Sequence, residues 1–128
     1  MALDAFFRKL DAPLKNSRWS WGAIGHDQNI YLRVWQDETK KIEGKLHVRI
    51  YLSGEHEDSN PGNNERKSHI EMIENGSQCF LVMCLAKDPK ATKRQIQHYN
   101  KNCLFLGGNM MKSDDDIWIE IVGKKPLK

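Results

Sequence analysis

The chain has 128 residues, of which 39% are hydrophobic and 29% are charged, and its formal net charge is +3 at pH 7. This length suits a single domain over residues 1–128, and the composition excludes disordered and collagen-like proteins. The longest apolar run, Cys79 to Ala86, is far shorter than the roughly 18 residues of a membrane-spanning helix, so we expect no membrane partner.

The N-terminal segment contains acidic residues and lacks a basic leader and a cleavage site, so we expect a cytoplasmic protein without a signal peptide. Three cysteines, Cys79, Cys84 and Cys103, form no C-x-x-C pair, which favours reduced thiols over a disulfide framework. The histidines are scattered along the chain. We therefore expect no metal and no cofactor.

Apolar residues near the N-terminus recur at helical spacing. Leu3, Phe6, Phe7 and Leu10 predict a short amphipathic helix, and Pro13 disfavours helical geometry at the preceding residue. We expect residues 1–13 to form an N-terminal helix packed on or beside the barrel-like sheet of the same domain.

Three strands are predicted next, at Trp19 to Ile24, Ile30 to Gln36 and Lys45 to Leu52, with a turn at 25–29 and a polar loop at 37–44. Alternation gives the second and third strands an aliphatic face and an aromatic and basic face. The aliphatic sets are Ile30, Leu32 and Val34, and Leu46, Val48, Ile50 and Leu52. The opposite sets are Tyr31, Arg33 and Trp35, and Lys45, His47, Arg49 and Tyr51. If the two strands pair, the aromatic and basic sets share one side of the sheet.

The second half of the chain continues with an exposed loop at 53–64 and a helix over 65–75, capped by Asn63 or Asn64 and ending at Gly76. A central buried strand is predicted at 78–86, and a basic loop or short helix follows it at 87–101. A short strand is predicted at 103–108 and a final strand at 116–122. The fold class is therefore α+β, with a mostly antiparallel curved sheet or pseudo-barrel and two or three helices.

The aromatic and basic face predicts a nucleic-acid or ligand site at Tyr31, Arg33, Trp35, His47, Arg49 and Tyr51, because aromatic rings stack on bases and arginine holds phosphate. The basic run between Lys87 and Lys101 supplies peripheral phosphate contacts from Lys90, Lys93 and Arg94. In the alternative interpretation, Trp19, Trp21 and Trp118 fill a core. Arg33 and Arg49 then pair with Asp37, Glu38 or Glu120.

The chain carries no nucleophile, phosphate-loop or dinucleotide motif, so we predict no catalytic residues and a binding module rather than an enzyme. One alternative is a small metal-dependent nuclease or defence-related enzyme that uses acidic groups such as Asp116 and Glu120 near Lys124. Another is an interaction subunit with a protein partner, since Trp, Tyr and Arg also dominate protein interfaces.

Several segments together resemble the PUA-like superfamily of small barrels, in particular its EVE-type bacterial members. They are "SRWSWGAI", "ERKSHIEMIENG" followed by "CFLVMCLAKDP", and the closing "DDDIWIEIVGKKPL". The chain is also similar to bacterial proteins that carry an N-terminal SR-x-SWGA stretch. The resemblance implies a pseudo-barrel whose cleft accepts RNA or a modified or flipped DNA base. It also implies Trp21 and Trp35 as aromatic walls, with Ser17, Arg18 and Ser20 bonding a base edge or phosphate.

Overall fold

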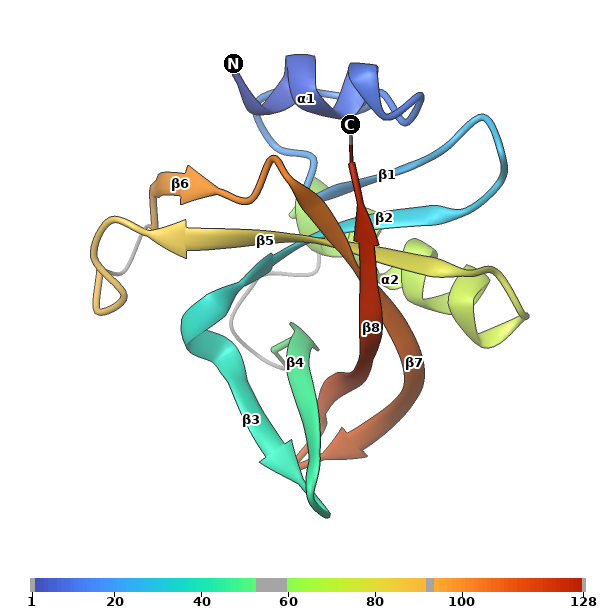
Figure 1. The fold of residues 1–128 in the computed structure, drawn as a ribbon, viewed down its shortest axis with the longest axis vertical. Coiled ribbons are helices and arrows are strands. Elements are labelled where there is room, and N and C mark those ends of the chain that lie inside the picture. Colours follow the sequence, from blue (N-terminus) through green and yellow to red (C-terminus); the bar gives the residue numbers. More distant parts are fainter. Residues whose placement is uncertain (1, 53–59, 92–93, 128) are drawn as a thin grey trace.

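A mixed β-sheet forms the centre of the fold, with one helix above it and a second behind it in the view of Figure 1. The computed structural model describes residues 2–52, 60–91 and 94–127. Within these residues the helices are α1 (Leu3–Lys9) and α2 (Pro61–Glu74), with a 3-10 turn η1 (Gln36–Glu38). The eight strands of the same residues are β1 (Gly22–Ile24), β2 (Ile30–Trp35), β3 (Thr39–Ile42), β4 (Lys45–Tyr51), β5 (Cys79–Ala86), β6 (Ile96–Tyr99), β7 (Cys103–Ser113) and β8 (Asp116–Pro126).

The strand order is β1-β2-β5-β7-β8-β4-β3, with β6 attached to β5. The ladder between β2 and β5 is parallel, and the other ladders between described strands are antiparallel. This confirms an α+β chain with a mostly antiparallel sheet. The predicted closure into a pseudo-barrel is not observed, because the described parts of β2 and β4 share no hydrogen-bonded ladder. The pairing of these two strands, on which one shared aromatic face depended, is therefore absent.

Arg66 of α2 bridges β2 and β4 where the sheet stays open. Its guanidinium donates to the carbonyl oxygens of Ile50 on β4 at 2.6 Å, of Arg33 on β2 at 2.8 Å and of Trp21 at 2.9 Å. A side chain thus replaces part of the missing backbone ladder.

Two hydrophobic clusters lie on opposite faces of β2, as its alternation predicts. The first contains Phe6, Phe7, Ala23, Tyr31, Phe80, Val82, Cys84, Tyr99 and Leu104, so it joins α1 to the sheet. The second contains Ile30, Leu32, Val34, Val48, Ile50, Ile70, Cys79, Leu81 and Ile119, so it joins α2 to the curved interior. The aliphatic face of β2 is confirmed as core, and the opposite face is largely core as well.

Several predicted boundaries differ from the structure. The strand predicted from Trp19 begins only at Gly22, because residues 17–19 form a turn in which the Ser20 amide donates to the Asn16 carbonyl. The predicted basic loop or short helix contains β6, which pairs with the end of β5. The strand predicted over 103–108 extends to Ser113 as β7.

The polar loop predicted at 37–44 contains the edge strand β3, which pairs with β4 through a two-residue turn. Glu43 and Gly44 in this turn have φ values of 54° and 79°, the backbone of a type I′ hairpin. Because β3 lies at the edge of the sheet and both Lys40 and Lys41 are exposed, it lacks the apolar alternation that identifies a half-buried strand.

Helix α2 begins earlier than the sequence predicts. Asn60, not Asn63 or Asn64, is the N-cap, and its side-chain oxygen accepts a hydrogen bond from the Asn63 amide at 3.0 Å. Pro61 occupies the first helical position, where its missing N–H is no loss. The predicted end is confirmed: Gly76 follows the helix with a φ of 110°. No helix within the described ranges is long and apolar enough to cross a membrane.

Candidate ligand-binding groove

A groove of about 640 Å³ runs between α2, β1 and the segment that precedes β1. Most of its polar lining comes from α2, and most of its apolar lining comes from β1 and the segment before β1. Its lining residues are Pro13, Lys15, Trp19, Ala23, Ile24, Pro61, Asn64, Glu65, Ser68 and His69. This volume and this mixture of apolar walls with a few polar groups are typical of small-ligand sites.

The wall beside Trp19 depends on a glycine in the first turn of α2. A Cβ on Gly62 would lie 2.6 Å from the Trp21 indole and 2.7 Å from the Trp19 carbonyl oxygen, both closer than atoms pack. Trp21 therefore supports the groove by packing under α2. Trp19, which is half-buried, lines the groove itself.

Glu65 is held by hydrogen bonds from the SRWSWGA stretch, residues 17–23. Its carboxylate accepts a hydrogen bond from Ser20 Oγ at 3.0 Å and one from the Trp21 amide at 3.3 Å. Ser20 is itself buried and accepts from the Asn16 amide at 3.0 Å. Desolvation raises the pKa of Glu65 in spite of these bonds. Ser20 therefore positions Glu65, and its hydroxyl is already engaged within the protein.

His69 lies one helical turn after Glu65 and also lines the groove. Its side chain is only 4% exposed, and its Nδ1 has no hydrogen-bond partner within the described residues. Burial and the nearby Arg66 cation lower the pKa of His69 to about 4. At neutral pH the wall of the groove therefore contains an uncharged imidazole, and its Nδ1 is buried.

The other predicted residues of this stretch, Ser17 and Arg18, lie exposed just before Trp19. The Arg18 amide donates to Asn16 Oδ1 at 2.8 Å, which holds the turn. Their side chains are thus on the surface beside one wall of the groove.

The six residues predicted on β2 and β4 do not form one open face. Tyr31 is buried, donates to Asp27 Oδ2 at 3.0 Å and stacks on Phe80. His47 is buried too, with Nδ1 2.7 Å from the Lys45 carbonyl oxygen. Tyr51 packs against the inner cluster, because an irregularity between Arg49 and Tyr51 shifts the register of β4.

Arg49 belongs to an ion-pair cluster beside η1. Its guanidinium contacts Glu38, lies 3.5 Å from Asp116 Oδ2 and faces the Trp118 ring at 5.8 Å. The alternative interpretation, in which Arg49 forms a structural ion pair, is therefore confirmed, and Glu38 is one of its partners. Asp116 takes the place of Glu120, which instead lies 3.9 Å from Lys45.

Trp35 is half-buried, and the guanidinium carbons of Arg33 and Arg94 lie over its ring at 5.9 Å and 5.3 Å. Arg94 also forms two 2.8 Å bonds to the Asp37 carboxylate. The structure thus brings together Arg33, Trp35 and Arg94. Lys90 is exposed nearby in sequence, and the predicted Lys93 lies outside the described residues.

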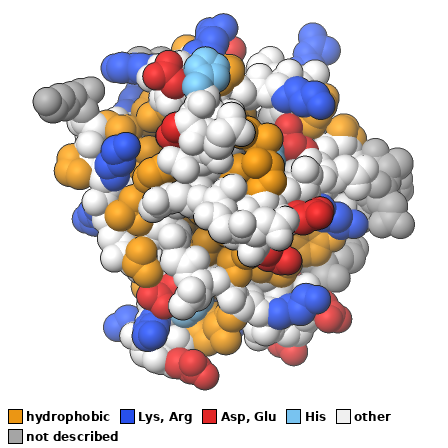
Figure 2. All heavy atoms as spheres, turned by 90° about the vertical axis from the view of Figure 1, so that its right-hand side faces the viewer, with side chains coloured by type: hydrophobic (Ala, Val, Ile, Leu, Met, Phe, Trp, Pro, Cys, Tyr) orange, Lys and Arg blue, Asp and Glu red, His pale blue; other side chains and the backbone are white. Residues whose placement is uncertain are grey.

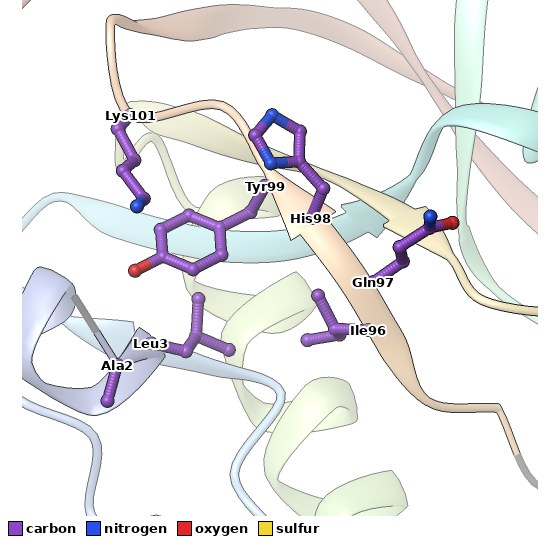
Figure 3. Close-up of a pocket in the computed structure, with 7 residues that line it drawn as sticks. All are labelled: Ala2, Leu3, Ile96, Gln97, His98, Tyr99 and Lys101. Atoms are coloured by element: carbon purple, nitrogen blue, oxygen red, sulfur yellow. The ribbon is translucent and has the colours of Figure 1, made fainter.

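A smaller hollow of about 280 Å³ lies between the start of α1 and β6. Figure 3 shows Leu3 and Ile96 below the ring of Tyr99, with His98 directed away from them. Lys101 lies over the Tyr99 ring at 5.5 Å. Its lining is apolar at Leu3 and Ile96 and polar at Gln97, His98 and Lys101, and its volume is less than half that of the groove beside α2.

Charges are mixed on the side of the molecule shown in Figure 2, where Lys and Arg side chains are spread around the margin among Asp and Glu. This side has no continuous basic surface.

Across residues 2–52, 60–91 and 94–127, no group of three His, Cys, Asp or Glu side chains is placed to hold a metal ion. Residues 53–59 of the loop predicted at 53–64, which include Glu55, His56, Glu57 and Asp58, fall outside those ranges.

No model of a known protein family matches the sequence, and comparisons with characterised proteins and with solved structures find no significant match. The resemblance to PUA-like barrels therefore stays a prediction.

Sequence reasoning missed the polar wall of the groove, formed by Asn64, Glu65, Ser68 and His69. A signal was present: these residues follow an i, i+1, i+4, i+5 pattern, which places them on one side of a helix. Polar side chains on a helix face directed at other elements indicate a site, whereas the same residues on an outer face indicate only solvation.

Proposed function

We propose that the chain is a non-enzymatic nucleic-acid-binding module that takes a nucleobase into the groove beside α2. One observation carries the proposal: a half-buried tryptophan, Trp19, lines a groove to which α2 contributes the anchored Glu65 and the buried His69. An aromatic wall stacks on the face of a base, and polar groups meet its edge.

The polar wall suits the edge of a base because it combines acceptors and donors. Glu65 offers carboxylate oxygens held in place by Ser20 and Trp21. His69 is neutral because burial lowers its pKa to about 4, so its imidazole can donate from one nitrogen and accept at the other. Base edges present both kinds of group.

Cations beside Trp19 support a nucleic-acid ligand over an uncharged one. Lys15 lines the groove and Arg18 lies on the turn just before Trp19, both exposed to solvent. A strand whose base occupies the groove extends its flanking phosphates outwards, where exposed Lys and Arg side chains contact them.

The proposal is tested by titrating labelled single- and double-stranded DNA and RNA, with and without modified bases, against wild type and Trp19→Ala. Stacking contributes about 1–3 kcal/mol per base, so we expect Trp19→Ala to weaken binding roughly 5- to 150-fold. Val122→Ala serves as the control, since Val122 is exposed on β8 and does not line the groove. Absence of binding at low salt, or equal affinity in Trp19→Ala and wild type, would contradict the proposal.

The same titration separates this function from a protein-interaction subunit. Binding to phosphates weakens steeply with salt because counterions are released, so the logarithm of the affinity should fall linearly with the logarithm of salt concentration. Cleavage of the labelled strands on addition of Mg²⁺ would instead indicate a nuclease.

A further inference from the structure

Arg33 differs from the other arginines that are buried or half-buried in the described chain. Arg49, Arg66 and Arg94 each direct their guanidinium at carboxylates or backbone carbonyl oxygens. The Arg33 guanidinium has no such acceptor among the described residues, although its backbone carbonyl accepts from Arg66. Among the buried and half-buried arginines of the described residues, Arg33 is therefore the one whose guanidinium lacks a carboxylate or carbonyl partner.

The surroundings of Arg33 do not compensate its charge. On one side the Trp35 ring lies 5.9 Å from its guanidinium carbon. Arg94, which shares that ring, is itself engaged by Asp37. The nearby Cys84 thiol stays protonated, because burial raises its pKa to about 12. The positive charges of Arg33 and Arg66 also act on each other.

A partly buried charge without a partner is costly, and proteins usually pair such charges or place them where a ligand supplies the partner. Arginine stays protonated even when burial lowers its pKa, so it does not avoid this cost by losing its proton. The planar guanidinium presents donors in a fork that matches the oxygens of a phosphate. An incoming oxyanion would satisfy donors that the protein leaves free.

We propose that the half-buried Arg33 guanidinium binds a phosphate group, with the Trp35 ring beside it. That the phosphate belongs to a nucleic-acid backbone rests on the proposed function. The anion site itself does not.

The probe for the site is inorganic phosphate, titrated at constant ionic strength against chloride and followed by NMR. We expect saturable shifts of the Arg33 side-chain Nε–Hε and Trp35 indole resonances in wild type, and at least a tenfold loss of affinity in Arg33→Gln. Arg33→Lys keeps the charge but not the fork, so it should bind phosphate more weakly than wild type.

Arg8→Gln is the matched control, because Arg8 is an exposed arginine of α1 that pairs only with Asp4 at 3.8 Å among the described residues. It should bind phosphate as wild type does. The proposal is overturned if phosphate moves no resonance of Arg33 or Trp35, or if Arg33→Gln retains the wild-type affinity. If Arg33→Gln does not fold, the proposal is tested by the phosphate-induced shifts in wild type and by the affinity of Arg33→Lys, which should be lower than that of wild type.

An oligonucleotide titration keeps this site separate from the proposed function. With a single strand, Arg33→Gln should reduce the slope of log affinity against log salt by about 0.7, the value for one phosphate contact. If phosphate binds at Arg33 and no oligonucleotide binds, the anion site stands and the nucleic-acid function fails. If oligonucleotides bind with an unchanged slope and phosphate does not bind, the function stands and the anion site fails.

Discussion

Arg66 connects three separate segments through a single buried guanidinium. Its carbonyl partners belong to Trp21, Arg33 and Ile50, and the side chain is only 5% exposed. Burial lowers the pKa of Arg66 to about 10, so the group remains charged at neutral pH. Burying this charge costs free energy, and the hydrogen bonds to the three carbonyl oxygens across the open part of the sheet offset that cost.

We expect Arg66→Met to lower the free energy of unfolding by about 2–4 kcal/mol, because each buried carbonyl left unsatisfied costs about 1–3 kcal/mol and the lost charge offsets part of this. Urea denaturation measures the change. Lys67→Met, one residue along α2 and exposed, is the control and should change stability little. Equal stability of the two variants would show that Arg66 does not bridge the strands.

His69 predicts a pH dependence of stability. Its pKa is about 4 in the folded protein and 6.5 when unperturbed, so the unfolded chain binds the proton more readily between these values. The contribution of a neutral His69 is therefore fully present above pH 6.5 and is lost as the pH falls towards 4.

In His69→Gln this loss should be smaller between pH 6.5 and 4, as measured by urea denaturation at several pH values. His98→Gln is the control, because His98 is exposed on β6. A wild-type and a His69→Gln profile that run parallel would contradict the buried, neutral state of His69.

For single residues, the sequence pattern predicts whether a side chain is buried better than it predicts whether the side chain binds a ligand. Ile30, Leu32 and Val34 are core as alternation predicts. Tyr31 is core as well, because α1 covers the second face of β2. Alternation distinguishes two faces of a strand, and it does not reveal that a distant segment covers both.

Hairpins with two-residue turns shape one end of the sheet, and they explain the acidic cluster at 114–116. Asp114 and Asp115 connect β7 to β8 with φ values of 54° and 69°, while Asp116 pairs with Arg49. Two of the three acidic residues thus occupy turn positions that Asp tolerates. The third contributes to the ion-pair cluster.

We expect Asp115→Gly to raise the free energy of unfolding by about 0.5–1 kcal/mol, because glycine adopts a positive φ without steric cost. Gly44→Ala in the equivalent turn between β3 and β4, where φ is 79°, should lower it by a similar amount. Thermal unfolding followed by circular dichroism measures both. Shifts of the same sign in the two variants would contradict the type I′ assignment.

Elements with strong patterns, α1, β2, β4, α2, β5 and β8, are predicted from the sequence because each has an apolar face or a recognisable end. Edge elements are not. β3 is polar because solvent surrounds it, and β6 lies within a basic segment whose composition favours a loop. The cap at Asn60 was missed, although Pro61 directly after it suits the first position of a helix.

The whole molecule combines an open curved sheet, a bridging arginine and a groove beside α2. The same helix supplies Arg66 to the sheet and Glu65 and His69 to the groove, so its placement connects stability with the site. The groove could not be predicted in full, because the residues before β1 and those on α2 are more than 40 positions apart, as in the bond between Ser20 and Glu65. That contact depends on the fold alone.

The central claim, a base stacked against Trp19, is tested most directly by photocrosslinking with a bromouracil-substituted oligonucleotide and mass spectrometry of the linked peptide. We predict a crosslink to the peptide that contains Trp19, competed by unlabelled oligonucleotide and reduced when Glu65 is changed to Ala. A crosslink to Trp35 or Trp118 with none at Trp19, or no competable crosslink at all, would contradict the account.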